Sequence, residues 1–66
     1  MQIVLNGQII QVVDQCSITK MLETLALKNQ RVAVEVNQEV IPRAQHNSFA
    51  LSSGDKVEVI QAVGGG

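Results

Sequence analysis

Hydrophobic and polar positions alternate at the start of the chain in a pattern typical of a β-hairpin. The segment MQIVLNGQIIQVV places two β-rich runs on either side of Asn6-Gly7, a pair that tolerates the positive φ angles of a type I′ turn. Pairing across that turn sets Leu5 opposite Gln8, Val4 opposite Ile9 and Ile3 opposite Ile10. One face of the hairpin is then predicted to join the core: Met1, Ile3, Leu5, Ile10 and Val12. The other is predicted to be mixed and exposed: Gln2, Val4, Ile9 and Gln11.

The next segment has the spacing of an amphipathic helix. Ser17 is a candidate N-cap, and apolar residues recur after it at i, i+3, i+4 and i+7: Ile18, Met21, Leu22 and Leu25. We predict that this stripe, with Met21 as core filler, faces a sheet and that the helix ends near Lys28-Asn29.

Strand-like alternation returns after the helix. In RVAVEVN the residues Val32, Val34 and Val36 predict a strand with one buried face. A turn at Gln38-Glu39 is expected to lead into a short strand in EVIPR, which lies at a sheet edge because Pro42 cannot donate a ladder hydrogen bond.

The remaining residues predict a connection and a last strand. Residues 44–55 connect the elements, with Phe49 and Leu51 turned inward and a turn at Ser53-Gly54-Asp55, and KVEVIQAV forms the fifth strand. The order β-β-α-β-β-β suits an α+β fold of the β-grasp type, a mixed five-stranded sheet with one helix packed on one face. Parallel pairing of the first and last strands is a property of that fold and does not follow from periodicity. We expect one domain, 1–63, and a flexible glycine tail, 64–66.

Composition excludes several classes of function. Of the 66 residues, 45% are hydrophobic and 17% charged, which is a globular composition, and the net charge is −1. There is no basic cluster, and Phe49 is the single aromatic residue, so neither an electrostatic nor a base-stacking nucleic-acid surface is predicted.

Candidate reactive side chains and targeting segments are scarce. Cys16 is the single cysteine and no basic residue adjoins it in sequence, so a bystander thiol is the favoured interpretation. His46 has no second metal ligand spaced with it, so we expect no metal site. No apolar run approaches the roughly 20 residues of a membrane span, and no signal-peptide pattern is present, so we expect a cytoplasmic protein without a membrane partner.

The sequence ends in three glycines. Gly64, Gly65 and Gly66 have no Cβ and populate positive φ freely, so they can lie in a channel too narrow for other residues. The terminal carboxylate is ionised at neutral pH and could attack an activated phosphate. A flexible linker end has the same composition and remains the alternative.

A docking surface is predicted on the uncovered face of the sheet. If Val57 and Val59 face the helix, Ile60 faces away and is expected to neighbour Val4 and Ile9. Scattered exposed aliphatic residues are also normal, so the patch stays a hypothesis. Arg43, beside Pro42, is a further candidate contact for an acidic partner surface.

Three segments carry a resemblance to a known family. MQIVLNGQ at the start, VAVEVNQEVIPR in the middle and LSSGDKVEVIQAVGGG at the end resemble the sulfur carrier proteins of thiamine biosynthesis, which are ubiquitin-like β-grasp carriers. The resemblance covers essentially the whole chain. His46 stands near the Pro-Arg pair, where the family often has an aromatic residue, and Thr19 and Lys20 make the helix start less acidic than is usual there.

The resemblance implies a carrier that is not itself an enzyme. It implies that an adenylating enzyme uses ATP and magnesium to convert the Gly66 carboxylate to an acyl-adenylate. Sulfur from a persulfide donor then displaces AMP, and thiazole synthase takes the sulfur from the resulting thiocarboxylate. Gly65 would be the required neighbour of Gly66, and Gly64 falls where some relatives have alanine. The carrier itself would bind no cofactor.

Two alternatives stay open. A sister carrier for molybdopterin synthesis or another thiolation pathway shares the fold and the diglycine, although molybdopterin carriers tend to be longer. The other is a β-grasp interaction module whose tail takes no part in chemistry. Intact mass after incubation with ATP, an adenylating enzyme and a sulfur source separates carrier from module.

Overall fold

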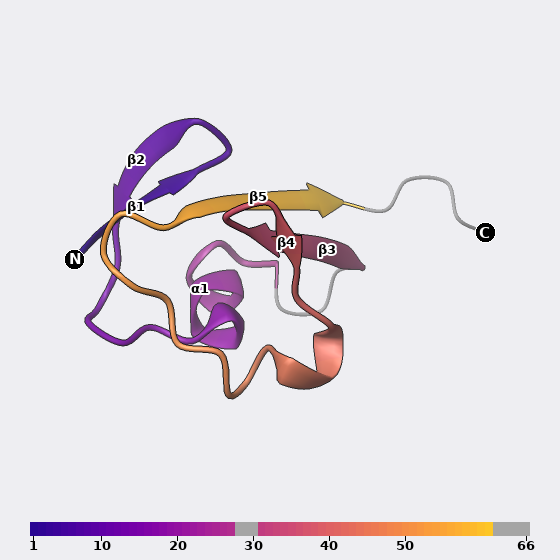
Figure 1. The fold of residues 1–66 in the computed structure, drawn as a ribbon. Coiled ribbons are helices and arrows are strands. Elements are labelled where there is room, and N and C mark those ends of the chain that lie inside the picture. The colour runs from indigo at the N-terminus through magenta and orange to yellow at the C-terminus, as the bar shows by residue number, and fades with distance from the viewer. Residues whose placement is uncertain (28–30, 62–66) are drawn as a thin grey trace.

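The computed structural model of the chain describes residues 1–27 and 31–61. Within that part, five strands and one α-helix follow one another in the predicted order, with a short 3-10 helix before the last strand (Figure 1). The elements are β1 (Gln2–Leu5), β2 (Gln8–Gln11), α1 (Ile18–Thr24), β3 (Val32–Val36), β4 (Glu39–Val40), η1 (Arg43–Gln45) and β5 (Lys56–Gln61).

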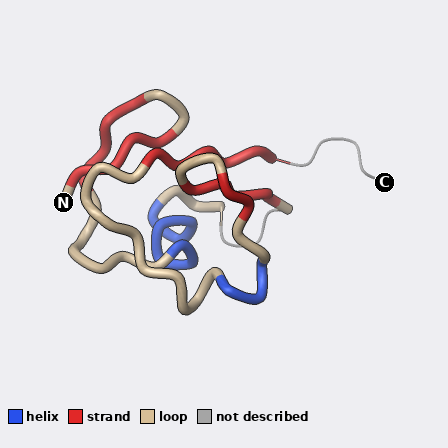
Figure 2. Tube along the Cα trace, in the orientation of Figure 1, coloured by secondary structure: helices blue, strands red, loops and turns tan. Residues whose placement is uncertain are grey.

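The strands form one mixed sheet in the order β2-β1-β5-β3-β4. β1 and β5 are parallel neighbours, and the other pairs are antiparallel. The helix α1 lies on one side of the sheet (Figure 2). The predicted α+β arrangement is confirmed, including the parallel pair, while residues 64–66 of the predicted tail lie outside the described residues.

The core fills the space between sheet and helix. Its buried members come from β1, α1, β3, β5 and the connections: Ile3, Cys16, Ile18, Met21, Leu22, Val34, Val36, Ile41, Leu51 and Val57. Phe49 is half-buried against them, so the prediction that Phe49 and Leu51 turn inward is confirmed. Every residue of this buried core lies at or before Val57.

The first hairpin has the predicted register. Ile3 pairs with Ile10, Val4 with Ile9 and Leu5 with Gln8, around Asn6 and Gly7 at φ 48° and 83°. The predicted inner face packs on the core, and Ile9 on the outer face is 67% exposed.

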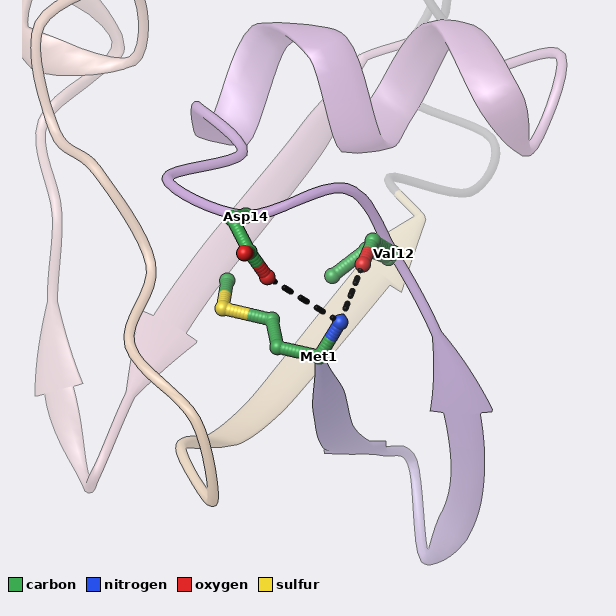
Figure 3. Close-up of polar contacts among 3 residues, drawn as sticks. All are labelled: Met1, Val12 and Asp14. Atoms are coloured by element: carbon green, nitrogen blue, oxygen red, sulfur yellow. Dashed lines mark hydrogen bonds and ion pairs between the residues drawn. The ribbon is translucent and has the colours of Figure 1, made fainter.

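The start of the chain closes the open end of this hairpin. The Met1 ammonium donates to the Val12 carbonyl at 2.7 Å, and the Val12 N–H donates to the Met1 carbonyl at 2.9 Å. Figure 3 shows the ammonium also facing Asp14, whose Oδ1 lies 3.4 Å away. Asp14 is 90% exposed, so this ion pair contributes little, and the two backbone contacts hold the strand.

The helix begins as predicted and ends earlier. Ser17 is the N-cap, and its Oγ accepts from the Lys20 N–H at 3.0 Å. The expected end near Lys28-Asn29 is wrong, because α1 stops at Thr24 and Ala26 turns to φ 60°. The Ala26 N–H donates to Glu23 and the Leu27 N–H donates to Leu22, which is the Schellman pattern. Backbone geometry therefore ends the helix within the apolar stripe.

Replacing Ala26 with glycine is expected to stabilise the protein by about 0.5–1 kcal/mol, because a left-handed conformation strains any residue with a Cβ. Ala26 is exposed, so no packing is lost. Thermal unfolding measures the gain. Ala33→Gly is the matched control, because Ala33 is exposed within β3, where the same change should destabilise by a similar amount. A lower melting temperature for Ala26→Gly would contradict the strain.

The second hairpin corrects two details of the prediction. The turn lies at Asn37-Gln38, with φ 51° and 70°, rather than at Gln38-Glu39. β4 contains two residues, and Pro42 follows the strand instead of lying in it, although the strand does form a sheet edge. His46 is buried and its Nε2 donates to the Ile41 carbonyl at 3.0 Å, so this imidazole joins the residue that follows β4 to the residue that follows η1.

Candidate functional site

β5 is the element that connects the core to the glycine tail. It lies between β1 and β3 in the middle of the sheet. Val57 is 1% exposed and Val59 packs against the core, whereas Ile60 is 54% exposed on the opposite face. The predicted orientation of this strand is confirmed. The last described element before the glycine tail is therefore the central strand of the sheet.

The predicted patch residues of the outer sheet face fall into two groups, and Val40, which is 64% exposed opposite Glu35, lies on the same face. Val4 pairs with Ile9 on one side and with Lys56 of β5 on the other. Ile60 lies four residues beyond Lys56, about 13 Å along the strand, and pairs instead with Ala33 of β3. The expectation that Ile60 neighbours Val4 and Ile9 is therefore wrong, although all three share the face.

A pair of carboxylates separates these two groups. Glu58 of β5 lies directly opposite Glu35 of β3, in the row between Lys56 and Ile60. Like charges directly opposite one another destabilise a sheet, so this row is not explained by folding stability. The sequence pattern gave no sign of this pair, because it depends on the register between β3 and β5.

Arg43 lies apart from this face. It is the first residue of η1, which follows β4 outside the sheet (Figure 1). Its side chain is exposed, but the structure does not bring it together with Ile60, Val4 or Ile9. Gly64, Gly65 and Gly66 lie outside the described residues, so the described part of the site is the end of β5 and the sheet face around it.

Cys16 is a buried thiol. Its side chain is 3% exposed and its Sγ lies 3.4 Å from the Ser17 carbonyl. Burial raises the pKa of the Cys16 thiol, and the nearby Lys20 ammonium opposes that rise. The sequence analysis did not identify Lys20 as a charge near Cys16, because Lys20 is four residues away and comes close to the thiol only through the first turn of α1. The protonated, enclosed thiol agrees with the interpretation of Cys16 as a bystander.

Two other kinds of functional feature are absent from the described ranges 1–27 and 31–61. No group of three or more His, Cys, Asp or Glu side chains in those ranges is placed to hold a metal ion. None of the helices there is long and apolar enough to span a bilayer.

Known proteins similar to this chain share both its sequence pattern and its fold. Residues 3–66 match the family model described as the ThiS family. The sulfur carrier protein ThiS of Escherichia coli K12 is 30% identical over 66 residues, with all of both chains covered. A thiazole synthase of Paramagnetospirillum magneticum is 32% identical over the same length, and the chain spans only 20% of that protein.

A solved structure gives the same result in three dimensions. The thiamine biosynthesis protein ThiS of Geobacter metallireducens superimposes with a TM-score of 0.85 at 30% sequence identity, and both chains are covered completely. This likeness confirms the ubiquitin-like β-grasp fold. Since the family model spans nearly the whole sequence, and relatives matched over their full length are similar in sequence and in fold, the chain belongs to the ThiS family.

Proposed function

We propose that this protein carries sulfur on its C-terminal glycine for thiazole formation in thiamine biosynthesis. The observation that carries the proposal is the match to a sulfur carrier protein over 100% of both chains, which extends through the terminal glycines of this chain. The protein is a co-substrate of other enzymes and does not itself catalyse a reaction. It acts in the cytoplasm.

The chemistry begins at the carboxylate of Gly66. A carboxylate oxygen attacks the α-phosphate of ATP, held with magnesium by an adenylating enzyme of the ubiquitin-activating type, and pyrophosphate leaves. The outer sulfur of a persulfide attacks the acyl carbon and AMP leaves. A thiol then cleaves the remaining S–S bond, becoming oxidised to a disulfide and leaving the glycyl thiocarboxylate. The carrier binds no cofactor, because ATP and magnesium belong to the partner.

The tail meets two physical requirements of this chemistry. Gly65 and Gly66 present a carboxylate without neighbouring side chains, and Gly64 extends the same narrow stretch. Ordering three residues costs roughly 3–6 kcal/mol, which contacts with the folded body must offset. Ile60, exposed one residue before the end of β5, is the described apolar residue best placed to supply such a contact. Val4 and Ile9, farther along the same face, and Arg43 on η1 would extend it.

Thiazole synthase is the proposed acceptor of the sulfur. A segment similar to the whole chain occupies a fifth of a protein named thiazole synthase. A carrier-like domain joined to the enzyme that consumes its sulfur is a direct way of keeping donor and acceptor together. This relationship favours thiamine over a sister thiolation pathway.

Transfer from the loaded carrier tests the pathway. Chain bearing the thiocarboxylate is mixed with thiazole synthase and its small substrates, or with a molybdopterin synthase catalytic subunit and its precursor. Intact mass spectrometry follows the mass of the carrier in each mixture. We expect the carrier to return to its carboxylate mass only in the first mixture. Loss of sulfur only in the second would assign the chain to the sister pathway. If the chain is not loaded in the presence of an active adenylating enzyme, the remaining interpretation is a β-grasp interaction module.

A further inference from the structure

The far end of β5 is held by a side chain where its neighbouring strand has ended. β1 stops at Leu5, opposite Val57, while β5 continues to Gln61. The Asn6 backbone N–H donates to the Val57 carbonyl at 2.9 Å. Beyond that point the Asn6 side chain replaces the missing strand: its Oδ1 accepts from the Val59 N–H at 2.9 Å, and its Nδ2 donates to the Val59 carbonyl at 3.3 Å.

The hairpin turn makes this contact possible. Asn6 has φ 48°, a left-handed conformation that asparagine tolerates better than most residues with a Cβ. The side-chain amide has both a donor group and an acceptor oxygen, and so matches the N–H and C=O that a strand residue would meet in a ladder. A residue that the sequence predicts only as a turn former therefore also pairs with the strand that leads to the tail.

A second asparagine makes a similar contact at the opposite end of β5. Asn37, the first residue of the other hairpin turn, has φ 51°. Its Oδ1 accepts from the Lys56 N–H at 3.0 Å, and its Nδ2 donates to Asp55 Oδ1 at 3.0 Å. Asn37 thus holds the start of β5 from the β3 side, and Asn6 holds the end of β5 from the β1 side.

We propose that Asn6 is a positioning residue for sulfur loading, because its contacts with Val59 fix the direction in which β5 presents the glycine tail. This inference rests on the proposed carrier function. Without the amide, the Val59 N–H and C=O lose these partners, and the end of β5 is held only by its pairing with β3. The partner then has to order more of the chain before Gly66 reaches the acyl-transfer site. Ile60 stays paired with Ala33, so docking is retained while positioning is lost.

The test compares matched glycine substitutions at the two asparagines. Glycine accepts positive φ, so Asn6→Gly and Asn37→Gly each remove a side-chain contact without straining the turn. Steady-state loading with the adenylating enzyme of the same organism, ATP and a persulfide donor gives kcat and KM. Hydrogen exchange of the Val59 amide, followed by NMR, reports the contact without any enzyme. Asn6→Asp is the intermediate variant, since it keeps the acceptor for the Val59 N–H and loses the donor.

We expect Asn6→Gly to lower kcat about tenfold with KM changed less than threefold, because small misplacements of a reacting group have large rate effects. The kcat of Asn6→Asp should lie between that of Asn6→Gly and that of the unsubstituted chain. The kcat of Asn37→Gly should lie within twofold of the unsubstituted value. Val59 exchange should accelerate in Asn6→Gly only. Equal kcat for both glycine variants, or unchanged Val59 exchange, would overturn the positioning role alone. No loading of the unsubstituted chain would overturn the proposed function and this role with it.

Discussion

Deletion of Gly66 is expected to abolish sulfur loading while the melting temperature stays within about 3 °C of the full chain. The shortened protein still ends in a glycine carboxylate, but that group falls one residue, about 3.5 Å, short of its place in the adenylating enzyme. Misplacement of a reacting group by about 1 Å is enough to cost a hundredfold in rate. Folding is expected to be spared because Gly66 has no side chain to bury and because, among residues 1–27 and 31–61, the buried core ends at Val57.

Gly64→Ala is the control for this deletion. It adds one methyl group to the tail and keeps both the length and the terminal Gly65-Gly66 pair, so loading is expected to stay within a few-fold. Intact mass measures loading and circular dichroism measures melting. Loading of the chain that lacks Gly66, at a rate close to normal, would show that its carboxylate is not the reacting group.

The Ile60→Asp substitution is expected to weaken binding to the adenylating enzyme roughly 30-fold, as for an interface anchor that contributes about 2 kcal/mol. Ile60 is 54% exposed and is the last described apolar side chain before the tail. A charge there would have to be desolvated against an apolar partner surface, beside the existing carboxylate of Glu58. Stability should fall by no more than about 1 kcal/mol, because the side chain lies outside the core.

Val13→Asp is the matched control for Ile60→Asp. Val13 is 62% exposed and lies beyond the end of β2, away from the outer-face pairs, so the same chemical change there should leave binding within twofold. Titration calorimetry with each variant gives the dissociation constants. If Ile60→Asp and Val13→Asp bind equally well, the docking surface is not the sheet face around β5.

The alternation of side chains was enough to predict the strands, the first hairpin and the buried faces. Asn6-Gly7 sets the register, and a slip by one residue would have exposed Ile3 and buried Gln2. The parallel pairing of β1 with β5 is non-local, so it required knowledge of the fold. The helix end was missed because Leu25 continues the apolar stripe while Ala26 adopts a left-handed conformation, for which alanine gives no signal.

The site was predictable in part for a similar reason. The orientation of Ile60 follows from alternation along one strand, and this prediction is confirmed. Its distance from Val4 depends on the stagger between two strands, which periodicity within each strand does not determine. The contacts of Asn6 with Val59 join residues 53 positions apart, and nothing in a local Asn-Gly pattern indicates them. Side-chain contacts of this kind require the assembled sheet.

The most direct test of the carrier proposal is the mass and position of the sulfur in the loaded chain. After incubation with ATP, adenylating enzyme and persulfide donor, intact and fragment mass spectrometry should find one oxygen replaced by sulfur, in the fragment that contains Gly66. A persulfide on Cys16 would instead add a whole sulfur atom to a fragment near the helix start. Sulfur found there, or no gain at Gly66, would contradict a carrier that works through its terminal carboxylate.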